Sequence, residues 1–210
     1  MQISLDYYKK TYYLRDAQGN IMATYNRAYA GESPQDLTMS FSLVERPIYG
    51  SSRIANFVDS VQLVYLEAGE TEFSYPDDIE LLEQNNGTKH VELTNHLGNV
   101  MAVVSDKRTP VLNATATAIE SFQPELLIAK DYYPFGMEMS GRYGGTGGTE
   151  PLDEYRFGFG GQEKDDEITG QTGSVYTATF WEYDARIGRR WNIDPVDKAN
   201  ESSYLAFSGN

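Results

Sequence analysis

The amino-acid sequence predicts an all-β fold of consecutive antiparallel hairpins with little helix. Strand-like runs with alternating polar and apolar residues are frequent, whereas stretches with helical periodicity are scarce. Tyrosine and glycine are abundant, with 16 and 19 copies among 210 residues, which suits many short strands joined by tight turns. A turn-containing segment of ten residues also occurs twice, so one kind of hairpin is used more than once.

The predicted strands follow one another along most of the chain. They comprise residues 11–14, 21–25, 39–44, 57–66, 91–94, 100–104, 175–183 and 190–193. Turn-forming residues separate them, most clearly at 16–20, 85–87, 95–99 and 158–161. The one amphipathic candidate for helix runs from Ala116 to Ala129. Because Pro124 interrupts it, we expect no more than a short helical turn there.

The repeated segment has a clear physical interpretation. Residues 14–23 and 93–102 both read L-x-[DN]-x-x-G-N-[IV]-M-A. The side chain of Asp16 or Asn95 can accept hydrogen bonds from backbone N–H groups of the turn, and the glycine takes a positive φ at low cost. The flanking apolar residues then form the paired strands of a hairpin. Because one hairpin buries little surface, such units need neighbours, as in a repeat array.

Charge and composition exclude several classes of function. The chain has 17 Lys and Arg against 31 Asp and Glu, a net charge of −14. This balance disfavours binding to nucleic acid and to anionic membranes, because both need positive charge. The absence of cysteine excludes disulfides, thiolate nucleophiles and Cys-ligated metals. No run approaches about 18 apolar residues, so we expect no membrane span, and residues 1–10 do not read as a signal peptide.

Six further segments occur in a defined order along the chain. They are IYGSSRI at 48–54, ELTNHLGNVMAVVSD at 92–106, DYYPFGM at 131–137, YRFGF at 155–159 with GQEKDDE at 161–167, WEYDARIGRRWNIDP at 181–195 and ESSYLAFSGN at 201–210. Together with the repeated hairpin, these segments resemble the YD-repeat proteins of the Rhs family. The likeness is to the Bacteroidetes branch and its Rhs-associated core domain, and it covers roughly residues 12–210.

The resemblance implies a segment of a hollow β-shell in a secreted or surface-displayed polymorphic-toxin protein that acts in interbacterial competition. Residues 1–140 would belong to the hairpin strip, 141–150 to a glycine-rich loop and 151–210 to the Rhs-associated core, all within a larger shell. The expected partners are the remainder of the parent Rhs chain or its secretion and chaperone proteins, and an encapsulated C-terminal toxin. No effector domain, cofactor, nucleic acid or membrane span is expected in this chain.

The resemblance also brings an alternative function, self-cleavage that releases a C-terminal toxin. In some relatives paired aspartates of the core lie near a cleavage point, and the matching residues are Asp184 and Asp194. Two neighbouring carboxyl groups can share a proton and act as acid and base. The sequence departs from the family pattern at Trp181 and Ala185, where Arg and Pro are usual. The competing interpretation makes both aspartates turn residues, with Asp184 paired to a nearby arginine, so we expect no enzyme.

Three weaker hypotheses concern ligands. A surface glycan-binding adhesin would stack sugars on exposed rings, whereas cross-strand packing is the ordinary use of aromatic residues in a sheet. The tyrosines in question are Tyr7, Tyr8, Tyr12, Tyr13, Tyr25, Tyr29, Tyr132, Tyr133, Tyr176 and Tyr183. An acidic cluster at 165–167 suggests calcium, and the pair His90 and His96 suggests zinc. The acidic cluster lacks the spacing of a calcium loop, and such histidines are more often ordinary polar residues of a hairpin, so we predict no metal.

Overall fold

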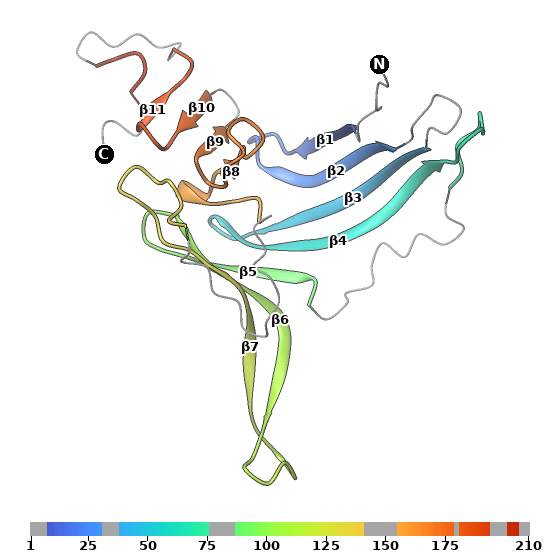
Figure 1. Ribbon diagram of the computed structural model, residues 1–210, viewed down its shortest axis with the longest axis vertical. Helices are drawn as coiled ribbons and strands as arrows, with labels where there is room; N and C mark the ends of the chain where they lie inside the picture. Colours follow the sequence, from blue (N-terminus) through green and yellow to red (C-terminus); the bar gives the residue numbers. More distant parts are fainter. Residues whose placement is uncertain are drawn as a thin grey trace, which may run out of the picture. The chain divides into compact units, whose positions relative to one another are not determined.

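The protein is described by a computed structural model, which covers residues 8–30, 38–75, 87–140, 155–178, 181–193 and 201–205. Within these residues the fold is all-β, as the sequence predicts. A seven-stranded sheet has the order β1-β2-β3-β4-β5-β6-β7, and a four-stranded sheet has the order β11-β10-β9-β8 (Figure 1). The chain forms two compact units, Met1–His90 and Val91–Asn210. The described residues include no helix long and apolar enough to cross a bilayer.

The first unit is a run of antiparallel strands. They are β1 (Tyr8–Arg15), β2 (Ile21–Ala30), β3 (Thr38–Tyr49) and β4 (Arg53–Leu66). Each strand pairs with the next along the chain, and several register irregularities interrupt the ladders. Such irregularities increase the local twist of a sheet. Aromatic side chains pack across strands. The Tyr25 and Phe41 rings, for example, stack with centroids 5.5 Å apart.

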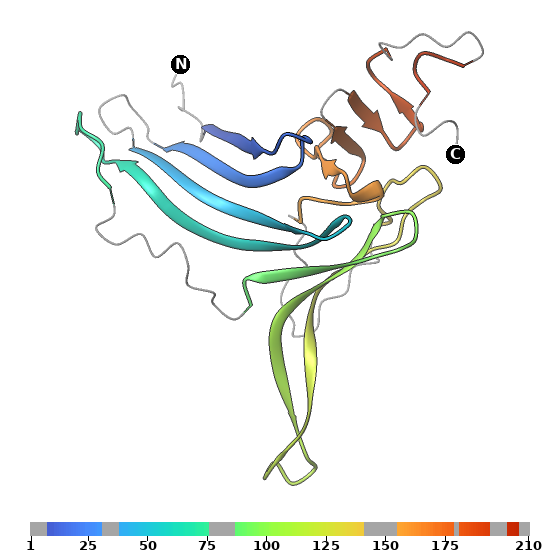
Figure 2. The ribbon, with the colours of Figure 1, turned by 180° about the vertical axis from the view of Figure 1, so that it is seen from behind.

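The second unit contains the long β6–β7 hairpin and the small sheet (Figure 2). Its strands follow β5 (Lys89–Thr94), which begins at the boundary between the units. They are β6 (Val100–Leu112), β7 (Ile119–Ala129), β8 (Glu163–Lys164), β9 (Val175–Ala178), β10 (Trp181–Asp184) and β11 (Arg189–Arg190), with a 3₁₀ turn η1 at Phe159–Gly161.

Two apolar clusters hold the second unit together. The first joins the base of the β6–β7 hairpin to the segment before β8, through Val100, Val103, Ile128, Tyr155 and Phe157. The second joins β9 and β10 through Tyr176, Tyr183 and Ala185, with Met137, Phe159 and Trp181 packed against them. Burying large apolar side chains in this way stabilises by roughly 1.5–3 kcal/mol each.

The repeated ten-residue segment forms the same turn in both places. The Asp16 carboxylate accepts hydrogen bonds from the backbone N–H groups two and four residues later, at 2.9 and 2.8 Å. The Asn95 amide oxygen accepts the equivalent pair, both at 3.0 Å. The following glycines have φ values of +90° at Gly19 and +83° at Gly98, a conformation that glycine adopts without steric cost. The predicted hairpin turn is therefore confirmed.

Residues 116–129, the one candidate for helix, contain no helical turn, and the strand found there was not predicted. The segment from Ile119 to Ala129 is strand β7, which pairs with β6 from Ala102 opposite Ala129 to Leu112 opposite Ile119. Pro124 lies opposite Arg108, next to a register irregularity. Proline is tolerated in a strand at such irregularities, because its missing N–H removes no regular ladder bond.

The prediction of one strand over residues 175–183 is wrong. The segment folds back on itself as β9 and β10, with Ala178 opposite Trp181 and Val175 opposite Asp184. An alternating pattern records which residues are buried but not where the chain reverses direction. The glycine-rich loop predicted at 141–150 lies outside the described residues.

Candidate functional site

The segment from Lys130 to Glu138 forms the turn on which the polar groups of the second unit are built. The Tyr133 N–H donates to the Met137 carbonyl and the Gly136 N–H donates to the Tyr133 carbonyl, both at 2.8 Å. Gly136 has a φ of +90°. Tyr132 and Glu138 pair across the turn through the backbone, in an isolated antiparallel β-bridge. This reversal brings Lys130 and Glu138 to the same side of the segment.

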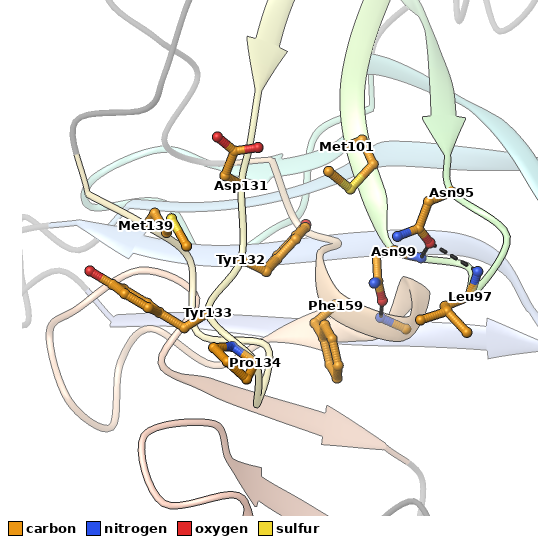
Figure 3. Close-up of a pocket in the computed structure, with 11 residues that line it drawn as sticks. Asn95, Leu97, Asn99, Met101, Asp131, Tyr132, Tyr133, Pro134, Met139 and Phe159 are labelled. Atoms are coloured by element: carbon orange, nitrogen blue, oxygen red, sulfur yellow. Dashed lines mark hydrogen bonds between the residues drawn. The ribbon is translucent and has the colours of Figure 1, made fainter. Parts of the chain in front are cut away.

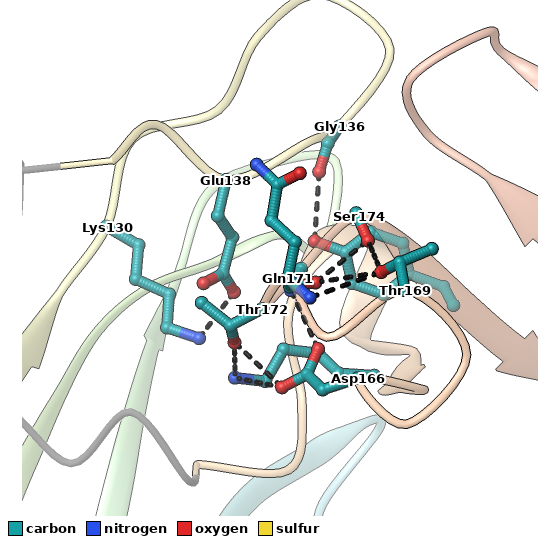
Figure 4. A network of polar contacts seen from close by, with 11 residues as sticks. Lys130, Gly136, Glu138, Asp166, Thr169, Gln171, Thr172 and Ser174 are labelled. Atoms are coloured by element: carbon teal, nitrogen blue, oxygen red, sulfur yellow. Dashed lines mark hydrogen bonds and ion pairs between the residues drawn. The ribbon is translucent and has the colours of Figure 1, made fainter.

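Lys130 and Glu138 form a completely buried ion pair (Figure 4). The Lys130 Nζ lies 2.5 Å from the Glu138 Oε1, and the two side chains are 0% and 1% exposed. Gly173 makes room for this pair, because a Cβ atom there would lie 2.3 Å from the Glu138 Cγ. The Glu138 N–H donates to the Gly173 carbonyl at 3.2 Å. The turn and the segment before β9 thus close over the pair together.

A second set of charges adjoins this pair. The Lys164 side chain is 3% exposed, donates to the Thr172 hydroxyl at 2.8 Å and lies 3.7 Å from the Asp166 carboxylate. Asp166 also accepts from the Thr172 hydroxyl and the Gly173 N–H, at 2.8 and 2.9 Å. Among the described residues no three His, Cys, Asp or Glu side chains are placed to hold a metal ion. In the acidic segment at 165–167, Asp166 belongs to a hydrogen-bonded network with Thr172 and Gly173.

Burial governs the acid–base properties of the network. Desolvation lowers the pKa of Lys130 to about 8, against the opposing attraction of Glu138, and the charge of Lys164 lowers it further. Desolvation also raises the pKa of Tyr132 and Tyr176, and the Glu138 carboxylate raises both further. The Lys130 and Tyr176 side chains lie in the protein interior, whereas Tyr132 is half-buried.

An apolar pocket of about 550 Å³ lies beside the network (Figure 3). Its lining includes Leu97, Met101, Tyr132, Met139 and Phe159. The hydroxyl of Tyr132 in this lining donates to the Val100 carbonyl at 2.6 Å. The volume falls in the range of small-molecule sites. Its lining also includes the polar residues Asn95, Asn99 and Asp131.

The structure places the predicted catalytic residue Asp184 at the end of β10, in a buried position. Its carboxylate accepts from the Arg186 Nε and Nη2 at 2.9 and 2.6 Å, and from the Arg186 N–H at 3.0 Å. The Trp191 Nε1 donates to it at 3.3 Å. The hydrogen bonds from Arg186 hold the pKa of Asp184 below its usual range. Asp194, the proposed partner, lies outside the described residues.

These contacts favour a structural role for Asp184. A carboxylate that a guanidinium keeps ionised is a poor proton donor, and its oxygens are already engaged. The competing interpretation from the sequence named this arrangement, a turn residue paired with a nearby arginine. The carboxylate accepts the backbone N–H two residues later, as turn aspartates commonly do.

The tyrosines are divided between packing and exposure. Tyr176 and Tyr183 are buried, and their hydroxyls donate to the carbonyls of Gly136 and Phe135 at 2.9 and 2.8 Å. These two rings cannot stack on a sugar. Tyr12, Tyr13 and Tyr133 have exposed rings. The side chains of Tyr7 and Tyr8 lie outside the described residues.

Sequence reasoning did not identify the Lys130–Glu138 pair. One signal was present, since a lysine and a glutamate flank the segment DYYPFGM. Opposite charges on either side of an apolar turn can meet when the turn closes. Their burial involves Gly173, which is distant in sequence and packs against Glu138.

Comparison with known proteins gives no relative, since no protein-family model, no curated protein and no solved structure matches the chain.

Proposed function

We propose that this chain is a structural, non-catalytic segment of the β-shell of a secreted Rhs-type YD-repeat protein. The observation that carries the proposal is the recurrence of one hairpin turn. Asp16 and Asn95, in equivalent positions of two repeated segments, accept the same two backbone hydrogen bonds. The strands also follow one another in the sheet in chain order. Successive hairpins of this kind are how a repeat array extends.

Two of the segments that resemble the Rhs family, at 131–137 and 155–159, serve the fold of the second unit. The DYYPFGM segment supplies the turn whose Phe135 and Gly136 carbonyls accept the buried tyrosine hydroxyls. The YRFGF segment contributes Tyr155 and Phe157 to one cluster and Phe159 to the other. These motif residues are used in packing and hydrogen bonding, which supports a wall element rather than an active site.

A shell segment also explains the partners that we propose. Outer strands of an open sheet carry unpaired N–H and C=O groups, which favour association with a further strand. In the parent protein the remainder of the Rhs chain would continue the sheet, and the enclosed space would hold or present a C-terminal toxin. Export to the medium or the cell surface is part of the same proposal, as is a role in interbacterial competition.

The experiment is to tag the gene on the chromosome of its native host, recover the tagged protein from cells and medium, and image it by electron microscopy. We expect an exported, hollow particle that contains this chain as part of its wall. A compact monomer of this chain alone that stays inside the cell would overturn the proposal.

Intact mass measured over several days distinguishes the structural role from the self-cleavage alternative. The purified chain and its Asp194→Asn variant are compared, each in the full polypeptide that the host produces. We expect no difference in cleavage between them. Fragments that form in the wild type and not in the variant would support the self-cleavage hypothesis and contradict a purely structural role.

A further inference from the structure

The buried ion pair of the second unit has the geometry of a reactive pair. The Lys130 Nζ and the Glu138 Oε1 are 2.5 Å apart, inside the packed interior, with side chains 0% and 1% exposed. An amine and a carboxyl group held in this way have the proximity that accelerates intramolecular reactions by many orders of magnitude. Nothing in the proposed shell role requires or predicts a reaction here.

Lys130 is also prepared to act as a nucleophile. Desolvation lowers its pKa to about 8, and the neighbouring Lys164 ammonium acts in the same direction. Burial and a second cation are the two standard means by which proteins activate a lysine amine. The neutral amine, unlike the ammonium, has a lone pair that can attack carbon.

The burial of the Lys130 amine determines which group it can react with. An amine with no exposed surface cannot meet a substrate from solution, and the acyl group in contact with it belongs to Glu138. We propose that Lys130 and Glu138 form an intramolecular isopeptide bond that staples the turn between residues 130 and 138. This inference is independent of the shell role.

The step balances without any added reagent. A proton moves from the Lys130 ammonium to the Glu138 carboxylate, which leaves a neutral amine and a carboxylic acid. The Nζ attacks Cδ, a new Nζ–Cδ bond forms and one Cδ–O bond breaks. The departing oxygen takes one proton from the acid and one from the amine and leaves as water, and nothing is oxidised or reduced. The product removes two buried charges, whose desolvation opposes folding.

The test is the mass of the purified wild-type chain. An isopeptide bond makes the protein about 18 Da lighter than its sequence requires, since one water is lost. Trypsin does not cleave at an acylated lysine. The digest should therefore contain a single peptide of residues 109–142, lighter by the same amount, in place of peptides 109–130 and 131–142. A wild-type digest that contains only the two separate peptides would overturn the proposal.

Two controls locate the reaction. The Lys130→Arg variant retains a positive charge but has no nucleophilic amine at neutral pH, so its peptides should have their full masses. A synthetic peptide of residues 126–142 contains both reacting residues without the surrounding fold, and it should stay unmodified. Loss of water at the same place in either control would show that the folded Lys130–Glu138 pair is not its source, and would equally overturn the proposal.

Discussion

The clearest prediction concerns Gly136, where backbone conformation and packing both require the absence of a side chain. Its φ is +90°, and a Cβ atom there would lie 2.3 Å from the Phe159 Cγ. Gly98 is the matched control in the same unit. Its φ is +83°, and a Cβ atom there would meet nothing within 4 Å.

The two alanine variants therefore separate strain from overlap. A positive φ costs an L-residue about 1–2 kcal/mol, and Gly98→Ala should lose only that amount of unfolding free energy. Overpacking costs about a further 1–3 kcal/mol, so Gly136→Ala should lose about 2–5 kcal/mol. Phe159 does not move easily, because its ring packs against Tyr132, Tyr176 and Tyr183 with centroids 5.9, 6.3 and 6.5 Å away.

Urea unfolding followed by tryptophan fluorescence measures this difference. Both tryptophans of the chain, Trp181 and Trp191, belong to the second unit and report on its unfolding. Combining Gly136→Ala with Phe159→Leu should make the alanine less damaging than it is in the wild-type background. Equal losses for Gly98→Ala and Gly136→Ala would refute the packing argument.

Three further predictions concern titration and turns. Because burial raises the pKa of Tyr132 and Tyr176 above the unfolded value of 10.0, their contribution to stability is complete below that pH. Above it, each loses about 1.4 kcal/mol per pH unit. Tyrosinate absorbance should show cooperative alkaline unfolding, and a smooth titration of all 16 tyrosines near pH 10 would contradict this. Asp184→Asn should lower the unfolding free energy by about 2 kcal/mol at neutral pH, since it removes a charged acceptor. Because Arg186 lowers the pKa of Asp184, this loss should shrink as the pH falls through that lowered value, and a pH-independent loss would argue against the ion pair. Asn95→Ala should cost about 1–2 kcal/mol through two lost turn hydrogen bonds, whereas Asn95→Asp retains the acceptor, and equal stability of the two variants in urea would be inconsistent with the turn.

Local rules predicted the hairpin turns well. At Asp16 and Asn95 the acceptor, the donors and the glycine all lie within five residues of one another. Such hydrogen bonds depend on short-range geometry, so residue identity is sufficient to predict them. The same locality made Arg186 a foreseeable partner of Asp184, two residues away along the chain.

Long-range pairing was harder to predict. The segment around Pro124 has helical periodicity, yet it is a strand because it pairs with β6 along most of its length. Tertiary context of this kind commonly overrides local propensity. The reversal between β9 and β10 was missed for a related reason. Polar and apolar residues alternate in the same way along one long strand and along two short antiparallel strands.

By itself, the sequence determined the all-β class, the two equivalent turns and the residues available for pairing, because each depends on neighbours close along the chain. Only the tertiary structure decided which charges are buried. Charged residues such as Lys130 and Glu138 are usually exposed, but in the folded protein Gly173 packs against Glu138 and the pair is buried. Burial is a property of the assembled interior, and it is burial that turns this pair from a solvated contact into a reactive one.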